Sequence, residues 1–494
     1  MSGESARILK AFSAYSLGSI ASSAINFILV PLYTRTLTPE LYGSVVLIQT
    51  ITTLLGLIAQ LGFPSALLRF WVESKTSGGF DRIGGSAIVA VETLCVLVVL
   101  GFNLSLSGLY QLLPELQPYT IALRLASLSI IFSSVKALSY MVLQGDERPS
   151  VYMKLNIVDL LAGVILIGFF LLVLRRGVQG VFEALLIKEM LICIPSVLVL
   201  KSRIRRIRFI FADTFRMMKY GVPVVVVIAH AWIVDGLNRF FLAGFASFAD
   251  VGVYNLGARV ASIMTIALVT PLANAWSPIA FSLGFTQKAQ STYSRLQTYV
   301  VFIGTFLCLV LAFVALPLVH IITNNPAYWQ ATKVVFVLAL SQLMFAMYYG
   351  FATPIGVSKR TELSAIMWLI NALVSVGLNW LLIPRFGLNG AMWATFFSYL
   401  QNLALSFFLG QHLFKVHYEY LRMIKVVSVA TFAYLISFFV PLQVSNIYVA
   451  ALLRLLLVTL TFIGGLTLLK FFREDELTAL RNPKSSLLSL VGKA

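Results

Sequence analysis

Apolar segments of about 20 residues or more recur along almost the whole chain, and this pattern constrains its fold more than any other feature. An α-helix needs about 20 mainly apolar residues to cross the hydrocarbon core of a bilayer. A helix also satisfies its own backbone hydrogen bonds, which lipid cannot do. Such windows lie near residues 8–33, 41–63, 83–107, 119–143, 151–174, 179–200, 214–244, 250–283, 296–322, 329–356, 361–383, 388–411, 420–440 and 447–470. The sequence therefore predicts an all-α polytopic membrane protein with about fourteen transmembrane helices.

The composition agrees with this prediction. Only 11% of the 494 residues are charged and 59% are hydrophobic, whereas about 25% of a soluble domain is charged. A net charge of +18 would also suit a nucleic-acid-binding protein, but the basic residues flank apolar segments, as they do in oriented membrane proteins. We therefore expect membrane lipids, and no nucleic acid, as partners. The window 8–33 is too long for a cleaved signal segment, so we interpret it as the first span.

Lysine and arginine gather in alternate connections between the spans. Cytoplasmic loops carry the excess of these residues, so the pattern predicts the orientation. One set of connections is rich in them, from Arg7 and Lys10 near the start to Arg481 and Lys484 near the end. The opposite set holds few, with the pair Arg175–Arg176 as the clearest exception. Both termini are predicted to be cytoplasmic.

Two short motifs recur in the same order in each half of the chain. The first pair is Gln144-Gly-Asp-Glu-Arg-Pro149 and Ile355-Gly-Val-Ser-Lys-Arg360, and the second pair is Gly177-Val-Gln-Gly180 and Gly387-Leu-Asn-Gly390. The same shift of about 210 residues aligns Glu40-Leu-Tyr-Gly43 with Asp250-Val-Gly252, and an even number of spans separates equivalent points. The halves are therefore predicted to be parallel repeats, related by a pseudo-twofold axis along the membrane normal.

This repeat predicts the organisation of the chain. A dense basic run, Lys201-Ser-Arg-Ile-Arg-Arg-Ile-Arg208, lies between the halves. It suits a cytoplasmic linker that rests near anionic lipid headgroups. The expected parts are a six-helix N-terminal lobe (1–200), the linker (201–213), a six-helix C-terminal lobe (214–412), two further helices (413–472) and a cytoplasmic tail (473–494).

Charged residues inside the apolar windows are the candidates for function, because ionised groups are costly in lipid and should face protein or a watery cavity. Asp235 and Arg239 are four residues apart, so they share a helix face and could pair. Arg259 is predicted to lie at the level of Asp235 on the next helix. This set either locks two helices together as ion pairs or contacts a substrate, and the sequence leaves both readings open.

A second layer of charge is predicted in the first half. Glu92, Lys136 and Asp159 lie at similar depth, where they form either a structural network or, with a spare carboxylate, a site that binds H⁺ or Na⁺ and couples transport. Lys188 and Glu189 are adjacent, and we expect them to point in different directions and not to pair. Lys188 is then a further cation for a cavity.

No enzyme site is predicted. The sequence has no Gly-rich phosphate loop with its lysine, no His, Cys or carboxylate pattern for a metal, and no nucleophile elbow. Its three cysteines all lie inside apolar windows, which argues against a disulfide framework. We expect no cofactor, no metal and no catalytic residue.

Three stretches resemble a known family. They are Val30-Pro-Leu-Tyr-Thr-Arg-Thr-Leu-Thr-Pro-Glu-Leu-Tyr-Gly43, Asp235-Gly-Leu-Asn-Arg-Phe-Phe-Leu242 with Val251-Gly-Val-Tyr-Asn-Leu256 and Trp276-Ser-Pro278, and Asn379-Trp-Leu-Leu-Ile-Pro-Arg-Phe-Gly-Leu-Asn-Gly-Ala-Met-Trp393. They are similar to the oligosaccharide flippases of bacterial polysaccharide biosynthesis, in the multidrug, oligosaccharidyl-lipid and polysaccharide exporter superfamily. The resemblance implies two six-helix bundles around a central cavity, with two extra C-terminal helices.

The resemblance also implies a function. Such flippases move undecaprenyl-diphosphate-linked sugar units from the cytoplasmic to the periplasmic leaflet of the bacterial inner membrane, as for O-antigen and lipopolysaccharide, and polysaccharide polymerases are expected partners. Arginine suits a diphosphate because its planar fork donates paired hydrogen bonds. The predicted substrate contacts are Arg259 first, then Arg239, Asp235, Lys188, Arg35 and Arg69, although Arg35 and Arg69 could equally anchor the chain at the interface. A multidrug or cation antiporter of the same fold and a membrane glycan polymerase are the competing hypotheses.

Overall fold

The computed structural model describes residues 27–77, 79–440, 446–474 and 476. These residues form helices and connections without a strand. Ten helical segments among them are long and apolar enough to cross a membrane, and α9 is an eleventh if its two parts, bent by 51°, count as one span. The prediction of an all-α multi-pass membrane protein is confirmed, whereas the number fourteen stays a prediction. Most of the predicted span 8–33 and of the tail 473–494 lies outside the described residues.

The helices follow the predicted windows closely. In the first part of the chain they are α2 (Pro39–Gln60), α3 (Phe63–Ser77), α4 (Phe80–Leu104), α5 (Leu106–Leu112), α6 (Thr120–Gly145), α7 (Pro149–Gly168), α8 (Gly177–Lys201) and α9 (Phe211–Phe245). In the second part they are α10 (Phe248–Ala261), α11 (Thr270–Leu283), α12 (Gln287–Ile322), α13 (Ala331–Phe351), α14 (Thr353–Val357), α15 (Thr361–Leu413), α16 (Tyr420–Phe439) and α17 (Ile447–Leu468). Short 3-10 turns occupy Pro114–Tyr119 and Pro326–Tyr328, and π-helical turns occupy Phe169–Val173 and Thr265–Val269.

Local sequence explains where several helices begin and end. Thr38 caps α2 with its side chain, which accepts from the N–H of Leu41, and Pro39 occupies the first turn, where its missing N–H costs nothing. The long helix α15 is broken at Gly387, whose φ of 53° is easily adopted only by glycine. This break falls between the two predicted spans 361–383 and 388–411.

The motifs that recur in the two halves adopt matching backbone conformations. Glu147 and Lys359, which precede α7 and α15, have φ angles of 56° and 60°. Gly177 and Gly387, which open the second motif of each half, have φ angles of 56° and 53°. These local matches support the aligned repeat motifs, and the symmetry of whole lobes stays a prediction.

The helix α3 was not predicted. We expected a connection after residue 63, but α3 occupies Phe63–Ser77 and packs on α4, α6 and α9. Its Trp71 is fully buried and donates from Nε1 to Asp146 Oδ1 at 3.0 Å. The basic residues of α3 hid its apolar face, because a hydropathy window averages both faces of a helix.

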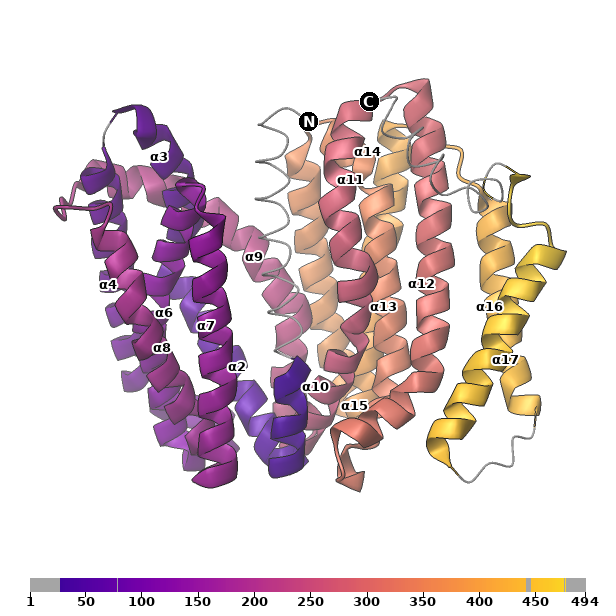
Figure 1. Ribbon diagram of the computed structural model, residues 1–494, viewed down its shortest axis with the longest axis horizontal. Helices are drawn as coiled ribbons and strands as arrows, with labels where there is room; N and C mark the ends of the chain where they lie inside the picture. Colours follow the sequence, from indigo (N-terminus) through magenta and orange to yellow (C-terminus); the bar gives the residue numbers. More distant parts are fainter. Residues whose placement is uncertain (1–26, 78, 441–445, 475, 477–494) are drawn as a thin grey trace. The chain divides into compact units, whose positions relative to one another are not determined.

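Contacts divide the chain into two compact units. The first comprises Met1–Arg259, Ile322–Val334 and Ala365–Ser398, and the second comprises Val260–Ile321, Val335–Ser364 and Tyr399–Ala494. In the first unit, α4, α6, α7 and α8 run side by side (Figure 1). A buried cluster that includes Phe63, Leu67, Trp71, Leu138 and Met217 joins α3, α6 and the start of α9.

The second unit has its own core. Phe462 of α17 is fully buried and stacks on Phe302 of α12 at a centroid distance of 5.8 Å. Trp276 of α11 donates from Nε1 to the hydroxyl of Thr353 at 2.7 Å. A buried cluster of α12, α16 and α17 side chains, which includes Val426 of α16 and Phe462, makes the two last helices part of a packed unit.

Candidate functional site

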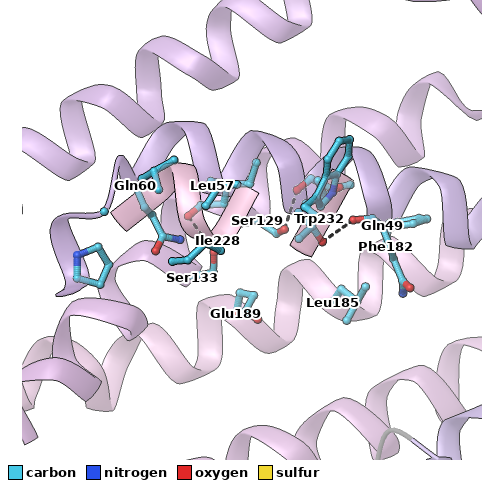
Figure 2. Close-up of a pocket in the computed structure, with 18 of the residues that line it drawn as sticks. Gln49, Leu57, Gln60, Ser129, Ser133, Phe182, Leu185, Glu189, Ile228 and Trp232 are labelled. Carbon is cyan, nitrogen blue, oxygen red and sulfur yellow. Dashed lines mark hydrogen bonds between the residues drawn. The ribbon is translucent and has the colours of Figure 1, made fainter. Parts of the chain in front are cut away.

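A cavity of about 670 Å³ lies within the first unit, among helices α2, α6, α8 and α9 and the start of α3 (Figure 2). Gln49, Leu57 and Gln60 border it from α2, and Ser129 and Ser133 border it from α6. The remaining walls carry the residues Phe182, Leu185 and Glu189 of α8 and Val225, Ile228 and Trp232 of α9. α2 and α6 belong to segments that are long and apolar enough to span a membrane, and α9 is a further span if its two bent parts count as one. The cavity wall carries both apolar and polar side chains.

Four hydroxyl groups of the cavity wall are held by their own helices. Thr52 and Thr53 each donate to a backbone carbonyl one turn back at 2.8 Å, and Ser129 and Ser133 donate at 2.7 and 3.0 Å. Each oxygen keeps its capacity to accept a hydrogen bond. The cavity wall therefore offers fixed acceptors, beside the amide groups of Gln49 and Gln60, to a ligand rich in hydroxyl groups.

Trp232 contributes an aromatic surface to the same cavity. Its Nε1 donates to the backbone carbonyl of Thr50 at 3.3 Å, which fixes the indole between α9 and α2. Trp232 was not predicted as a site residue, because tryptophans in apolar helices are more often part of the core or the membrane interface.

Four charged side chains form a closed set behind one wall of the cavity, here called the charge ring: Lys136 of α6, Asp159 of α7, and Lys188 and Glu189 of α8. Lys136 Nζ lies 3.1 Å from Asp159 Oδ2 and 2.8 Å from Glu189 Oε2. Lys188 Nζ lies 3.1 Å from Asp159 Oδ1 and 2.7 Å from Glu189 Oε1. Each lysine therefore pairs with both carboxylates, and the four formal charges cancel.

The charge ring corrects two expectations. Lys188 and Glu189 do pair, although adjacent residues leave a helix in different directions, because the long lysine side chain turns back to its neighbour. Glu189 also takes the place expected for Glu92, whose recorded partner is the Ser134 hydroxyl, which donates at 2.7 Å. Lys136 and Asp159 do meet, as expected for residues at the same depth in the membrane. Which carboxylates contact a lysine also depends on how each helix is rotated about its axis.

The predicted arginine cluster lies in the same unit. Arg239 is half-buried and donates from Nη1 to the Thr50 hydroxyl at 3.5 Å, while its Nε is buried without a hydrogen-bond partner among the described residues. Asp235 and Arg259 have exposed side chains and interact electrostatically with Arg239. These three residues do not belong to the described lining of the cavity. Their role as substrate contacts stays a prediction.

The other two predicted contacts have partners of their own. Arg35 donates from Nε to the carbonyl of Ile322 at 3.2 Å. Arg69 is exposed, lies 3.4 Å from Glu73 and stacks over the Tyr220 ring at 4.8 Å. Neither borders the cavity as described, nor does Lys188. In the part of the chain that the structure describes, no group of three or more His, Cys, Asp or Glu residues could hold a metal ion.

Residues 8–284 match the model of a protein family described as "Polysaccharide biosynthesis protein". A Haemophilus influenzae protein described as "Uncharacterized membrane protein" is 24% identical over 272 residues. That match covers 53% of this chain and 62% of the relative, so it spans less than two thirds of the relative's length.

Two solved structures share the fold. "Lipid II flippase MurJ, inward closed conformation" matches with a TM-score of 0.75 and 14% identity, over 92% of this chain and 98% of that chain. An inward-facing multidrug resistance MATE family transporter of the MOP superfamily matches with a TM-score of 0.65 and 14% identity, over 81% and 97%. At these identities the likeness concerns the fold alone.

Proposed function

Because the chain belongs to the polysaccharide biosynthesis protein family, we propose that it is a flippase for lipid-linked oligosaccharides. In this proposal, undecaprenyl-diphosphate-linked sugar units pass from the cytoplasmic to the periplasmic leaflet of a bacterial inner membrane. Two lobes, residues 1–200 and 214–412, rock to expose the binding site to one side and then to the other. Both termini are cytoplasmic, and polysaccharide polymerases are the partners that receive the sugar unit.

The cavity is the observation that supports this proposal best. A glycan presents many hydroxyl donors and apolar ring faces. The cavity presents hydroxyl oxygens that are already tied to their helices, two glutamine amides and the ring of Trp232. A wall of fixed polar groups binds without losing much side-chain freedom, so little affinity is lost to ordering.

We propose that translocation is driven by an H⁺ or Na⁺ gradient or by consumption of the flipped substrate. The sequence contains no phosphate-binding loop with its lysine, so we do not expect ATP hydrolysis by this chain. We also expect no catalysis, because the proposed task moves a lipid between leaflets and breaks no covalent bond.

Reconstitution tests the proposal. The full chain is placed in liposomes with a fluorescent lipid-linked sugar, and the outer-leaflet fraction is followed with a membrane-impermeant quencher. Wild type should equilibrate the leaflets faster than empty liposomes do. The substitution Thr53→Leu, in the cavity, should slow this exchange because it removes an acceptor and narrows the chamber.

Thr431→Leu in α16 is the matched control. Like Thr53, Thr431 is exposed and donates to its own helix at 2.8 Å, but it does not line the cavity. It should leave the exchange unchanged. Equal rates for Thr53→Leu and wild type would show that the cavity is not the path of the glycan.

One feature supports a second candidate, a cation antiporter of the same fold. Glu189 is the single ionisable side chain in the described lining of the cavity, and a carboxylate suits a cationic passenger. Against this candidate, two lysines already neutralise Glu189. Expression of the chain in a drug-sensitive strain separates the two: resistance to cationic drugs that Glu189→Gln abolishes would favour the antiporter.

A further inference from the structure

The charge ring is buried in the helical bundle, where holding four charged groups costs free energy of desolvation. Its four side chains are only 10–15% exposed, and Glu189 lies at the midpoint of α8. Taking charges out of water costs much of what their attraction returns, so apolar residues of similar size often stabilise such positions at least as well. Ionisable groups at this depth most often serve a function.

The four members of the charge ring are not equivalent. Glu189 borders the cavity, whereas Lys136, Asp159 and Lys188 do not belong to its described lining (Figure 2). The two ammonium groups are therefore reached from the cavity past a carboxylate that both of them contact. With Glu189 ionised, an anion that enters the cavity meets a negative group first and a ring with no net charge behind it.

Protonation of Glu189 would reverse this situation. The ring would keep two ammonium groups against one carboxylate, a net charge of one positive unit at the cavity wall. The proton would also turn Glu189 from an acceptor of the lysine hydrogen bonds into a weaker partner. Lys136 and Lys188 would then each have a donor available for an anion.

We propose that the charge ring is an anion site that opens when Glu189 takes up a proton. Its ligand is the diphosphate group of the lipid-linked passenger, so this inference rests on the proposed function. Lys136 and Lys188 bind the anion, Asp159 holds the two lysines in place, and Glu189 excludes anions until it is protonated. Proton and passenger then bind together, so the site accepts the diphosphate only when Glu189 carries a proton.

The other titratable groups near Glu189 do not replace it in this role. Tyr140 of α6 and Cys193 of α8 act on the ring electrostatically, and both side chains are ordinarily neutral between pH 5 and 8. Glu92 of α4 bonds to Ser134 and does not contact either lysine in the recorded contacts. From α2 and α9, the described lining contributes only uncharged side chains.

Linkage gives the proposal a measurable signature. If one proton must bind before the anion, the affinity for the anion rises by about tenfold for each unit that the pH falls while free Glu189 is ionised. By reciprocity, the factor by which protonation of Glu189 strengthens anion binding is also the factor by which a bound anion strengthens proton binding. Calorimetry in two buffers with different ionisation heats would therefore record about one proton taken up for each anion bound.

The test uses the full chain in nanodiscs of zwitterionic lipid, with geranyl diphosphate as the probe and geraniol as the uncharged comparison. Wild type should bind geranyl diphosphate more tightly at pH 6 than at pH 8 and bind geraniol equally at both. Because phosphate groups themselves titrate near pH 6, the decisive quantity is the difference between wild type and Glu189→Gln. That variant should bind the diphosphate at pH 8 at least as tightly as wild type does at pH 6, because its binding needs no proton on residue 189.

Asp159→Asn is the charge-matched control, because it also adds one positive unit to the ring but leaves Glu189 in place. It should keep the pH dependence of wild type, and Lys188→Met should weaken diphosphate binding and spare geraniol. The proposal is overturned if Glu189→Gln shows the same pH dependence as wild type. If that variant does not fold, calorimetry on wild type decides. Uptake of almost no proton for each diphosphate bound would then overturn the proposal.

The two proposals fail in different ways. Normal translocation of a lipid-linked sugar, with diphosphate binding that takes up no proton, would remove the anion site and leave the flippase. Absence of translocation in wild type, with proton-linked diphosphate binding intact, would remove the flippase and leave the anion site.

Discussion

Gly43 of α2 and Gly252 of α10 bring two helix backbones into direct contact. A Cβ atom on Gly43 would overlap the carbonyl oxygen of Phe248, and a Cβ atom on Gly252 would overlap the carbonyl oxygen of Pro39. The contact is reciprocal, because the same offset in sequence separates Gly43 from Gly252 and Pro39 from Phe248. The aligned stretches Glu40–Gly43 and Asp250–Gly252 thus pack against each other as equivalent surfaces do across a twofold axis.

This contact predicts that neither glycine tolerates a side chain. Gly43→Ala or Gly252→Ala should destabilise the protein by about 1–3 kcal/mol, because the obstacle is rigid backbone and the helices must separate. Thermal unfolding in detergent measures the effect. Gly101→Ala in α4 is the control, since nothing lies within 4 Å of its added Cβ, and alanine is favoured over glycine inside a helix. Equal midpoints for Gly43→Ala and Gly101→Ala would contradict the prediction.

Arg259 is predicted to be a separate contact for the diphosphate during its passage. Its side chain is exposed, and its charge adds to that of Arg239 nearby. Arg259→Ala should slow translocation of a fluorescent lipid-linked sugar by about tenfold or more, the loss of one hydrogen bond to a charged group. The translocation rate of Arg259→Lys should fall between the rates of wild type and Arg259→Ala, because lysine keeps the charge but loses the paired donors. A wild-type rate for Arg259→Ala would remove this residue from the site.

Asp146 joins three parts of the first unit at the end of α6. It accepts from Trp71 Nε1 at 3.0 Å and from Arg203 Nε at 2.6 Å, and its own side chain is almost buried. Asp146→Asn should therefore cost about 1–3 kcal/mol of stability, because a hydrogen bond to a charged partner is lost in a confined site. The neighbouring Glu147→Gln makes the same chemical change at an exposed carboxylate, 3.8 Å from Lys75, and should change stability by less than about 0.5 kcal/mol. Thermal unfolding of both variants measures the effect. An equal fall in the unfolding midpoint for Asp146→Asn and Glu147→Gln would refute the special role of Asp146.

Glu476 should make the second unit sensitive to acid. Partial burial acts to raise its pKa, but hydrogen bonds from the Arg473 N–H, the Tyr299 hydroxyl and Arg422 hold the pKa below its usual value of 4.5. A carboxyl with a lowered folded-state pKa contributes stability above its unfolded pKa, and that contribution is lost as the pH falls through the folded pKa. Wild type should unfold at a higher temperature than Glu476→Gln near pH 7. The difference should shrink as the pH falls below about 4.5, and a difference that grew on acidification would contradict this account.

Several features could be read from the sequence because they depend on the local chain alone. The windows 83–107, 151–174 and 179–200 correspond to α4, α7 and α8 within a few residues, apart from the π-helical turn after α7. A span requires an apolar length and little else. The turn at Gly387 was predictable in the same way, since its motif recurs at Gly177 and both need a positive φ. Resemblance in three stretches was likewise enough to indicate the family.

The candidate site could be predicted only in part. Depth along a helix follows from counting residues, so Lys136 and Asp159 were correctly set at one level. The partners within that level were not readable, because they depend on how each helix is rotated about its axis and on the path of a long side chain. Glu189 was therefore missed as the acid that both lysines share, and Trp232 was missed as part of the cavity wall.

The sequence by itself determined that this chain is a helical membrane protein of the polysaccharide biosynthesis family with charges held at depth, because span length, periodicity and short motifs are properties of contiguous residues. Only the tertiary structure decided which of those charges meet, that they cancel in a ring of four, and that one carboxylate of the ring reaches the cavity. Those facts depend on the packing of α2, α6, α7, α8 and α9 around one another, and packing arises from contacts between residues far apart in the chain.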